Sequence, residues 1–507
     1  MSEIYDIAII GGGINGCGIA RDAAGRGLDV YLCEKGDLGG ATSCASTKLL
    51  HGGLRYLEHY EFKLVREALQ ERERLWAIAP HFVRPLRFVL PYMPGMRPKW
   101  QLRLGLFIYD HIGGRVRLPG TTKVRLSGQA LGEGLAASLK TGFEYSDCWV
   151  EDNRLVVMNA KAASDLGAVI ETHTAMTAAK RDGDSWSVTV SRGGRQRPIR
   201  ARTLVNATGP WANDIVSRTA GRPARGKVRL VQGSHIVVPK LYAHDRCFIF
   251  QNSDGRIFFT IPYEGDYTLV GTTDRDFDGD IDRFSATGEE KAYLCNAVSR
   301  CFDKRLTTDD IVWSYSGVRP LYDDGASAAQ KATRDYVIEV DEEGGLGLVS
   351  IFGGKITTYR RLAETVMDKL APLLPQDKAK AAAERAGWTG EVALPGGDFE
   401  IDAFDDRLGA LRARYAFVPV DQLRRLFTYY GTRVPLVLGN AKSLADLGRA
   451  FGAGLTEAEV DYLVREEWAQ SAGDIVFRRS KLGLKMHSED IAALDRFLEG
   501  KRQSLAG

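Results

Sequence analysis

The chain has 507 residues, 44% of them hydrophobic and 26% charged, which is the composition of a folded protein and excludes a disordered chain. Its 68 Lys and Arg residues against 65 Asp and Glu residues leave a net charge of +3, too weak overall to indicate a nucleic-acid partner. Glycine is the one residue type in excess, at 55 positions, and the glycines are clustered.

The predicted elements begin with a β-α-β unit. A short apolar strand covers residues 4–10, a helix covers 14–25 and a second buried strand covers 28–34. A further helix is expected over residues 60–79, where apolar side chains recur at helical spacing. From about residue 140 to 350 short strands alternate with turns, which predicts a sizeable antiparallel sheet inserted between parts of the first domain.

The chain becomes helical towards its C-terminus. An apolar strand at residues 346–352 is followed by two glycines and by a helix that we expect from Ile356. A glycine-rich stretch over residues 385–400 is typical of a linker. Beyond it, Thr456 and Glu459 have the spacing of a helix capping box.

Gly11, Gly13 and Gly16 form a Gly-x-Gly-x-x-Gly turn between the first strand and the first helix. At such a turn the backbone N–H groups of the helix start bind a pyrophosphate. Glu34 ends the second strand, 23 residues after Gly11, where an acidic side chain accepts both ribose hydroxyls. A merely structural glycine turn leaves Glu34 unexplained, so this unit predicts a dinucleotide-binding domain.

Three further segments favour FAD over NAD. Residues 36–61 are dense in small, hydroxyl and basic side chains, which indicates an extended loop along a cofactor rather than the next helix of an NAD-binding domain. Residues 204–214 run from a strand into Gly209 and are expected to close over the nucleotide. Residues 350–364 read as a strand, a Gly-Gly pair and a helix start, whose partial positive charge would face the flavin N1/C2=O edge. An ordinary strand-to-helix turn is the alternative there.

The residues that we expect to bind FAD are Gly11, Gly13, Ile14, Asn15, Gly16, Glu34, Lys35, Thr42, Ser43, Ser46, Lys48, Leu50, His51, Gly52, Gly53, Ala207, Gly209, Trp211, Gly353, Gly354, Lys355, Ile356 and Thr357.

Six motifs, in order along the chain, resemble those of the FAD-dependent glycerol-3-phosphate dehydrogenases, the aerobic respiratory enzymes of bacteria. The motifs are HGGLRYLE (51–58), FEYSDCWV (143–150), VNATGPW (205–211), YSGVRPL (315–321), TRDY (333–336) and FGGKITTYR (352–360).

The resemblance covers essentially the whole chain and implies an α/β fold. A glutathione-reductase-type FAD-binding Rossmann domain would come from segments at about 1–80, 150–220 and 335–385, with an antiparallel substrate-binding sheet interleaved in a region spanning 1–390. A C-terminal all-α cap would cover 391–507. The resemblance also implies oxidation of sn-glycerol 3-phosphate to dihydroxyacetone phosphate, electrons passed to membrane quinone, and a homodimer.

A phosphate dianion as substrate requires a cluster of cations, preferably Arg side chains that bind oxygens bidentately. Four cations in the motifs stand beside Gly, Tyr or Pro, and they match positions that the family uses around its substrate: Arg55, Arg319, Arg334 and Lys355. Tyr56 and Thr357 are expected to complete the hydrogen bonds to the substrate. For any single arginine, a surface charge is the alternative.

Hydride transfer from C2 of the substrate to flavin N5 requires a group that accepts the hydroxyl proton, and near pH 7 histidine suits this role. His235 alternates with apolar neighbours on a predicted strand that would form the floor of the site, so we assign it as the base, with Arg319 and Lys355 beside it as catalytic residues. A core histidine satisfied by the backbone is the alternative. The loop over residues 36–61 is called the flavin loop below. His51 precedes a Gly-Gly pair in this loop, and we assign it to contact with the cofactor.

Residues 81–125 contain nine Lys and Arg residues against one acid, a net +8 that leaves −5 for the rest of a chain whose total is +3. These cations alternate with apolar and aromatic residues, as in segments that lie on an anionic leaflet. We therefore expect peripheral attachment at the cytoplasmic face of the inner membrane. Partial burial, with the arginines paired to acids elsewhere, is the alternative.

Other signals narrow the class of protein. The seven cysteines show no paired or zinc-like spacing, so reduced cytoplasmic thiols and no metal site are expected. The acidic N-terminus and the lack of any run of 18 apolar residues predict neither export nor a membrane-spanning helix. An oxidase that reduces O₂, an amine-oxidising relative and a flavin-binding protein without turnover are the alternatives to a quinone-linked dehydrogenase.

Overall fold

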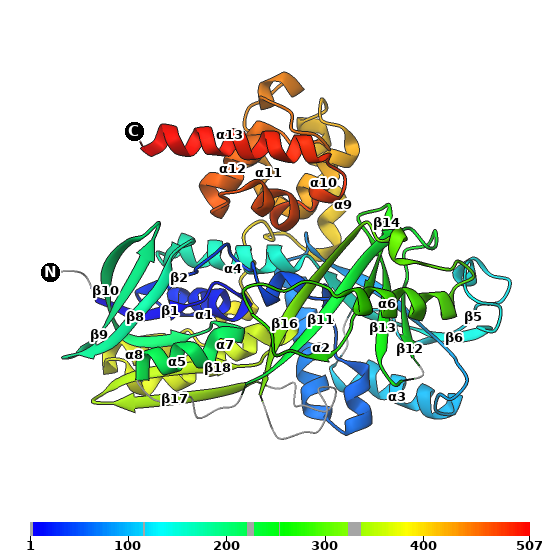
Figure 1. The fold of residues 1–507 in the computed structure, drawn as a ribbon, viewed down its shortest axis with the longest axis horizontal. Helices are drawn as coiled ribbons and strands as arrows, with labels where there is room; N and C mark the ends of the chain where they lie inside the picture. The colour runs from blue at the N-terminus through cyan, green and yellow to red at the C-terminus, as the bar shows by residue number, and fades with distance from the viewer. Residues whose placement is uncertain (1–3, 115–116, 221–227, 253, 323–335, 507) are drawn as a thin grey trace.

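The computed structural model describes residues 4–114, 117–220, 228–252, 254–322 and 336–506. Two sheets lie side by side, and a group of helices from the end of the chain forms a separate layer over them (Figure 1). The α/β fold with a C-terminal helical domain that the sequence predicts is therefore confirmed.

The first sheet has the order β17-β18-β10-β1-β2-β7, with the β8–β9 hairpin continuing from β10. Its strands are β1 (Ile4–Ile10), β2 (Val30–Cys33), β7 (Val169–Glu171), β8 (Ala175–Asp182), β9 (Ser185–Arg192), β10 (Arg195–Asn206), β17 (Val337–Glu343) and β18 (Leu346–Phe352). The central strands β18, β10, β1, β2 and β7 are parallel, so their carboxyl ends meet at one edge. Ligands of open α/β sheets bind at such an edge.

The second sheet has the order β15-β11-β14-β13-β12-β4-β6-β3, with β16 paired to β11 and β5 to β6. Its strands are β3 (Leu49–Leu50), β4 (Val83–Pro91), β5 (Thr122–Arg125), β6 (Thr141–Val150), β11 (Val228–Pro239), β12 (Cys247–Gln251), β13 (Ile257–Tyr263), β14 (Tyr267–Gly271), β15 (Arg275–Asp276) and β16 (Trp313–Tyr322). Its pairs are antiparallel except for β12 with β4. Because β3 belongs to the loop after β2, this sheet is joined directly to the nucleotide-binding unit.

The helices of the described residues are α1 (Ile14–Gly25), α2 (Phe62–Ile78), α3 (Lys99–Ile112), α4 (Asp152–Asp165), α5 (Ala212–Ala220), α6 (Gly288–Cys301), α7 (Tyr359–Leu370), α8 (Gln376–Glu384), α9 (Phe404–Arg414), α10 (Val420–Tyr430), α11 (Val434–Leu438), α12 (Glu457–Glu467) and α13 (Ser488–Ala506). Helix α1 contacts α4 and α7 in one large core, and α9 to α13 enclose a separate core of their own. None of the described helices is both long enough and apolar enough to cross a bilayer.

Two local predictions differ from the structure. The helix expected from Ile356 starts as a short 3-10 turn, η6 (Ile356–Thr358), before α7 begins. The capping box at Thr456 does not form: the Glu459 carboxylate instead accepts hydrogen bonds from Arg425, at 2.7 Å, and from Tyr430. The half-buried Arg425 outcompetes a backbone N–H for this carboxylate because a bond between two charged groups is the stronger one.

Candidate active site

The glycine turn after β1 is closed so tightly that larger side chains do not fit. A Cβ on Gly16 would lie 1.9 Å from the Gly11 carbonyl oxygen, and Gly11 itself has φ +109°. A Cβ on Gly11 would lie 2.6 Å from the oxygen of Ala207, at the end of β10. The start of α1 carries no side-chain cap of its own; the Ile14 N–H donates to Ser43 Oγ at 3.0 Å, from the loop after β2. A bare helix start of this kind binds phosphate.

Glu34 follows β2 beside this turn, as the sequence predicts for a ribose-binding acid. Its two carboxylate oxygens accept the backbone N–H groups of Gly12 at 2.7 Å and Gly36 at 2.8 Å. Burial raises the pKa of Glu34, and these two hydrogen bonds oppose that shift. A carboxylate has about four acceptor positions, so half of them stay available for the two hydroxyls of a ribose.

The carboxyl ends of β1, β10 and β18 bring the other predicted cofactor segments to the same place. Asn15 at the start of α1 donates to the Gly353 carbonyl at 3.3 Å, and a Cβ on Gly354 would meet the Asn15 amide at 3.1 Å. Gly209 (φ +58°) turns the chain after β10, and the ammonium of Lys35 lies 3.7 Å from the ring centroid of Trp211. The geometry fits a dinucleotide laid across this edge.

Tight anchors on the second sheet and on α3 hold the loop between Glu34 and α2. The Thr42 hydroxyl donates to the Val318 carbonyl at 2.6 Å. Leu50 lies in β3 and pairs with β6, and the Gly52 N–H donates to the Tyr109 hydroxyl at 2.8 Å. The loop therefore crosses from the nucleotide-binding edge onto the face of the second sheet.

Four residues in register form a row across β13, β14, β11 and β16: Phe259, Gly271, His235 and Tyr315. A Cβ on Gly271 would lie 2.1 Å from His235 Cδ2, so only glycine leaves room for the imidazole. His51 packs edge-on against Phe259, with ring centroids 6.4 Å apart. The flavin loop therefore lies over this row, and the row forms the floor beneath it.

His235 lies in the middle of this floor and is wholly buried. Its Nε2 lies 3.0 Å from the hydroxyl of Thr47, and its Nδ1 has no hydrogen-bond partner among the described residues. Burial lowers the pKa of His235 well below 6.5, and the nearby charges of Arg319 and Lys48 lower it further. The imidazole is therefore neutral at pH 7, and the same burial and nearby charges disfavour its protonated form.

Lys48 is buried in the left-handed backbone conformation, with φ +60°. Its ammonium donates to Asp152 at 2.7 Å and lies 5.1 Å from the ring centroid of Tyr315. Burial opposes the charge of Lys48, but Asp152 outweighs it, and the pKa of the lysine is raised. Ser46 also donates to Asp152, at 2.9 Å. The structure thus places Lys48 and Ser46, both predicted to bind the cofactor, on a buried carboxylate.

The predicted phosphate-binding cations take different positions. Arg319 on β16 pairs with Asp274 and donates to Thr272 Oγ1 at 3.1 Å. The ammonium of Lys355 lies 4.0 Å from the ring centroid of Tyr56. Arg55 and Tyr56 share the 3-10 helix η2 (Leu54–His59) and are half-buried, whereas Thr357 is buried in η6. Arg334 lies outside the described residues.

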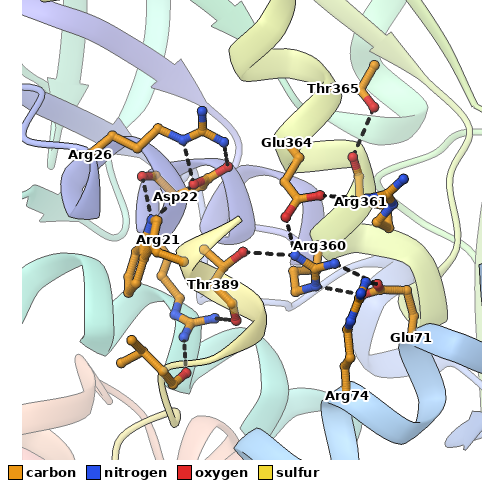
Figure 2. A network of polar contacts seen from close by, with 12 residues as sticks. Arg21, Asp22, Arg26, Glu71, Arg74, Arg360, Arg361, Glu364, Thr365 and Thr389 are labelled. Atoms are coloured by element: carbon orange, nitrogen blue, oxygen red, sulfur yellow. Dashed lines mark hydrogen bonds and ion pairs between the residues drawn. The ribbon is translucent and has the colours of Figure 1, made fainter. Parts of the chain in front are cut away.

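Arg360, the last residue of the sixth motif, has a structural role. It binds both oxygens of Glu71 on α2, at 2.6 and 2.7 Å, and reaches Thr389 at 3.2 Å, as Figure 2 shows. Arg21 on α1 donates to the Thr389 carbonyl in the same network. These contacts fix α7, and with it the Gly353–Gly354 turn, to α1 and α2.

Sequence reasoning missed several residues of the site. Tyr315 begins a quoted motif and Thr47 lies in the loop over residues 36–61, yet nothing in their spacing indicates a contact with His235. Asp37 and Asp152 bind cations from the C-terminal helices, hundreds of residues away in the chain. The sequence signal for Asp37 is an acidic residue among the glycines of the flavin loop.

Comparisons with known proteins agree with this geometry. Residues 6–360 match the family model of FAD dependent oxidoreductases, and residues 388–504 match that of the C-terminal domain of alpha-glycerophosphate oxidase. The chain is 46% identical to the aerobic glycerol-3-phosphate dehydrogenase of Escherichia coli, over 98% of this chain and 97% of the relative. The chain belongs to the FAD-dependent glycerol-3-phosphate dehydrogenase family.

Two further relatives of this family member are informative. D-erythritol 1-phosphate dehydrogenase of Brucella abortus is 47% identical to it over 97% of both chains. The glycerol-3-phosphate dehydrogenase of Bacillus halodurans, solved with FAD, is 26% identical and superposes with a TM-score of 0.73, over 98% of this chain and 94% of that one. FAD is the cofactor of the family, and the glycine turn, Glu34 and the Gly353–Gly354 turn are the residues that fit it.

The basic segment 81–125 divides into two parts. Strand β4 runs through the second sheet, and its Phe88 is buried. The segment 81–125 therefore does not lie at an interface over its whole length. Helix α3, in contrast, exposes Trp100, Leu104 and Phe107 by 65, 52 and 58%. These three positions recur at helical spacing on one face, with Lys99 and Arg103 exposed beside them. Arg115 lies outside the described residues.

Proposed function

We propose that this chain oxidises sn-glycerol 3-phosphate to dihydroxyacetone phosphate. One observation carries the proposal: a buried, neutral histidine lies beneath the predicted flavin loop, next to a cationic side chain, in a chain of this family. When bound, FAD would supply the acceptor for the hydride from C2 of the substrate, and the glycine turn, Glu34 and the Gly353–Gly354 turn would hold it. The protein has to bind the phosphate, orient the secondary alcohol and remove its hydroxyl proton.

His235 receives that proton through Thr47. The imidazole is wholly buried, whereas Thr47 is half-buried and holds its hydroxyl 3.0 Å from Nε2. With Nε2 as acceptor, the Thr47 hydroxyl takes the substrate proton as it passes its own to the histidine. The phosphate is bound by the four predicted cations, Arg55, Arg319, Arg334 and Lys355, which thereby hold the alcohol in place. Hydrogen bonds from Tyr56 and Thr357 complete the contacts to the substrate.

Anaerobic titration of the FAD-loaded protein with glycerol 3-phosphate tests the proposal. The yellow oxidised flavin should lose its visible absorbance in proportion to the substrate added. Retention of that absorbance with every polyol phosphate tried would reject catalysis and favour a flavin-binding protein without turnover.

D-erythritol 1-phosphate is a second candidate substrate, because a relative named for it is as similar to this chain as the glycerol-3-phosphate dehydrogenases are. Both compounds join a phosphate ester to a secondary alcohol and would use the same cations and the same base. The ratio of kcat/KM for the two compounds decides between them. A higher value for the four-carbon compound would replace glycerol 3-phosphate as the substrate.

The acceptor of the electrons is proposed to be a membrane quinone, reached by peripheral attachment at the cytoplasmic face. The exposed side chains of α3 and the exposed Tyr60 and Phe62, which follow η2, support this. In Figure 1 α3 lies at the opposite end of the molecule from the C-terminal helices. Quinone reduction without peroxide supports a dehydrogenase, while stoichiometric peroxide identifies an oxidase.

Two structural features are also proposed. The FAD-binding domain comprises segments at about 1–80, 150–220 and 335–385 within residues 1–390, and residues 391–507 form the helical cap. The enzyme works as a homodimer. Light scattering of the FAD-loaded protein in detergent tests the second point, since a monomer mass would reject it.

A further inference from the structure

The C-terminal helical layer reaches into the flavin loop through a short segment that follows α12. A π-helical turn, η12 (Asp474–Arg479), places two arginines on Asp37. Arg478 Nε lies 2.5 Å from Asp37 Oδ2, and Arg479 donates to both carboxylate oxygens, at 2.7 and 2.6 Å. Asp37 and Arg479 are both buried, so the pair is shielded from water.

Asp37 is linked by its neighbours to the glycine turn. The Gly39 N–H donates to the Gly12 carbonyl at 2.9 Å, and a Cβ on Gly12 would meet the Leu38 side chain at 2.8 Å. Asn153 on α4 holds the Leu38 carbonyl at 3.1 Å. The position of Asp37 therefore fixes the backbone on which the dinucleotide rests.

A second contact from the same segment reaches Asp152 at the start of α4, which in turn binds Lys48 of the flavin loop. Lys481, buried and in the left-handed conformation, lies 3.8 Å from Asp152 Oδ1. The other oxygen of Asp152 binds Lys48 at 2.7 Å. Glu467, at the end of α12, pairs with buried Arg154 on α4, so three buried charge contacts join the helical layer to this loop and its supporting helix.

We propose that Arg478, Arg479 and Lys481 are positioning residues of the FAD site, and that docking of the C-terminal helices and FAD binding are linked. A buried carboxylate that loses its partner is strongly destabilised, so without Arg478 and Arg479 the loop moves to hydrate Asp37. Linkage is reciprocal: if docking of the helical layer strengthens FAD binding, bound FAD stabilises the docked layer by the same free energy. The proposal rests on FAD as the cofactor and not on the substrate.

Titration of apoprotein with FAD, followed by flavin fluorescence, measures the linkage directly. Arg479→Met and Asp37→Asn should each raise the FAD dissociation constant by about 5- to 150-fold, the usual range for coupled sites. Arg425→Met is the matched control, because Arg425 makes an equally bidentate pair with buried Glu459 inside the helical layer. It should lower the melting temperature and leave the FAD dissociation constant unchanged.

An unchanged dissociation constant in both test variants, with lowered melting temperatures, would overturn the proposal and leave these contacts a purely structural role. Hydrogen exchange of the unaltered chain supplies a second test if the variants fail to fold. Amides of residues 474–481 should exchange more slowly once FAD is bound, and equal exchange with and without FAD would also overturn the linkage. Neither measurement uses a substrate, so both stay decisive if glycerol 3-phosphate is not oxidised.

Discussion

His235 and Tyr315 are register partners on adjacent strands, and their rings stack with centroids 4.8 Å apart and planes inclined by only 13°. The Tyr315 hydroxyl donates to the Ser46 carbonyl at 2.9 Å, so the stack is tied to the flavin loop from the other side. The histidine is therefore held in one plane by a neighbour that is itself anchored. A base whose ring does not rotate presents the same nitrogen to its partner in every turnover.

Removing the base should slow flavin reduction without lowering the amount of bound FAD. His235→Asn is expected to lower the rate of flavin reduction by about 10²- to 10⁴-fold, the usual contribution of a positioned base, while bound FAD stays near one per chain. Stopped-flow reduction and the flavin-to-protein absorbance ratio measure the two quantities. A rate within twofold of the unaltered protein would remove His235 from this role.

The proton relay predicts that Thr47 and His235 act as one unit. Thr47→Val removes the hydroxyl at nearly constant volume and should slow reduction by a similar factor, and the double variant with His235→Asn should be little slower than either single one. Tyr315→Phe is the comparison variant: it also removes one hydroxyl beside His235 but keeps the stacked ring and the Thr47 contact, so it should slow reduction much less than Thr47→Val. Independent, multiplying effects of the two substitutions would rule out a relay.

The stability of the fold should fall in mild acid because of buried neutral histidines. His81 lies between the FAD domain and the helical layer with neither ring nitrogen bonded among the described residues, and burial lowers its pKa well below 6.5, as for His235. Below about pH 6.5 the unfolded chain binds protons that the folded chain does not. Each such histidine therefore costs about 1.4 kcal/mol of stability per pH unit below that value.

His81→Leu isolates this effect. Melting temperatures measured between pH 5 and 8, about the range in which histidine titrates, should decline less steeply on the acid side for the variant than for the unaltered protein. At pH 8 the two should differ only by the change in packing against Phe82 and Phe399, which flank the ring. Parallel curves would show that His81 does not titrate on unfolding.

The buried pair of Lys48 and Asp152 should behave as a unit in stability. Lys48→Met leaves a buried carboxylate short of a partner and is expected to destabilise the fold by about 3 to 5 kcal/mol. The double variant Lys48→Met with Asp152→Asn should lose less than the sum of the two single losses, because the two charges that pair with each other are then removed together. Denaturant midpoints of the apoprotein measure all three, and simple additivity would contradict the coupling.

Attachment to membranes should depend on the exposed face of α3. Replacing Trp100, Leu104 and Phe107 by Ser is expected to abolish sedimentation with anionic liposomes at low salt, while reduction of a water-soluble dye stays unchanged, since these side chains lie on the surface. Replacing Arg103 alone by Ser, which removes one positive charge, should weaken liposome binding only modestly and reduce its dependence on salt. Undiminished sedimentation of the triple variant would place the contact elsewhere.

The local parts of the fold were predictable because their signals are local. The first strand and helix have the predicted bounds, since apolar periodicity and the glycine turn both depend on neighbouring residues. Glu459 was misassigned because its partner, Arg425, lies outside any local window. The contact of Asp37 with Arg479, 442 residues away, could not be predicted from spacing at all. In the basic segment 81–125, the part that forms β4 lies in a sheet rather than at a surface. Alternation of apolar and charged residues fits a sheet strand as well as an interface, so the sequence did not separate the two.

The order of synthesis adds a consequence to the strand order of the first sheet. Strand β1 is made first, yet it lies between β2 and β10, and β10 in turn pairs with β18, which ends at Phe352. The glycines that complete the cofactor edge and the arginines on Asp37 emerge still later. A chain leaving the ribosome is therefore able to enclose the glycine turn between β2 and β10 well before the rest of the cofactor edge exists. FAD is therefore able to contact all of its predicted segments only late in synthesis.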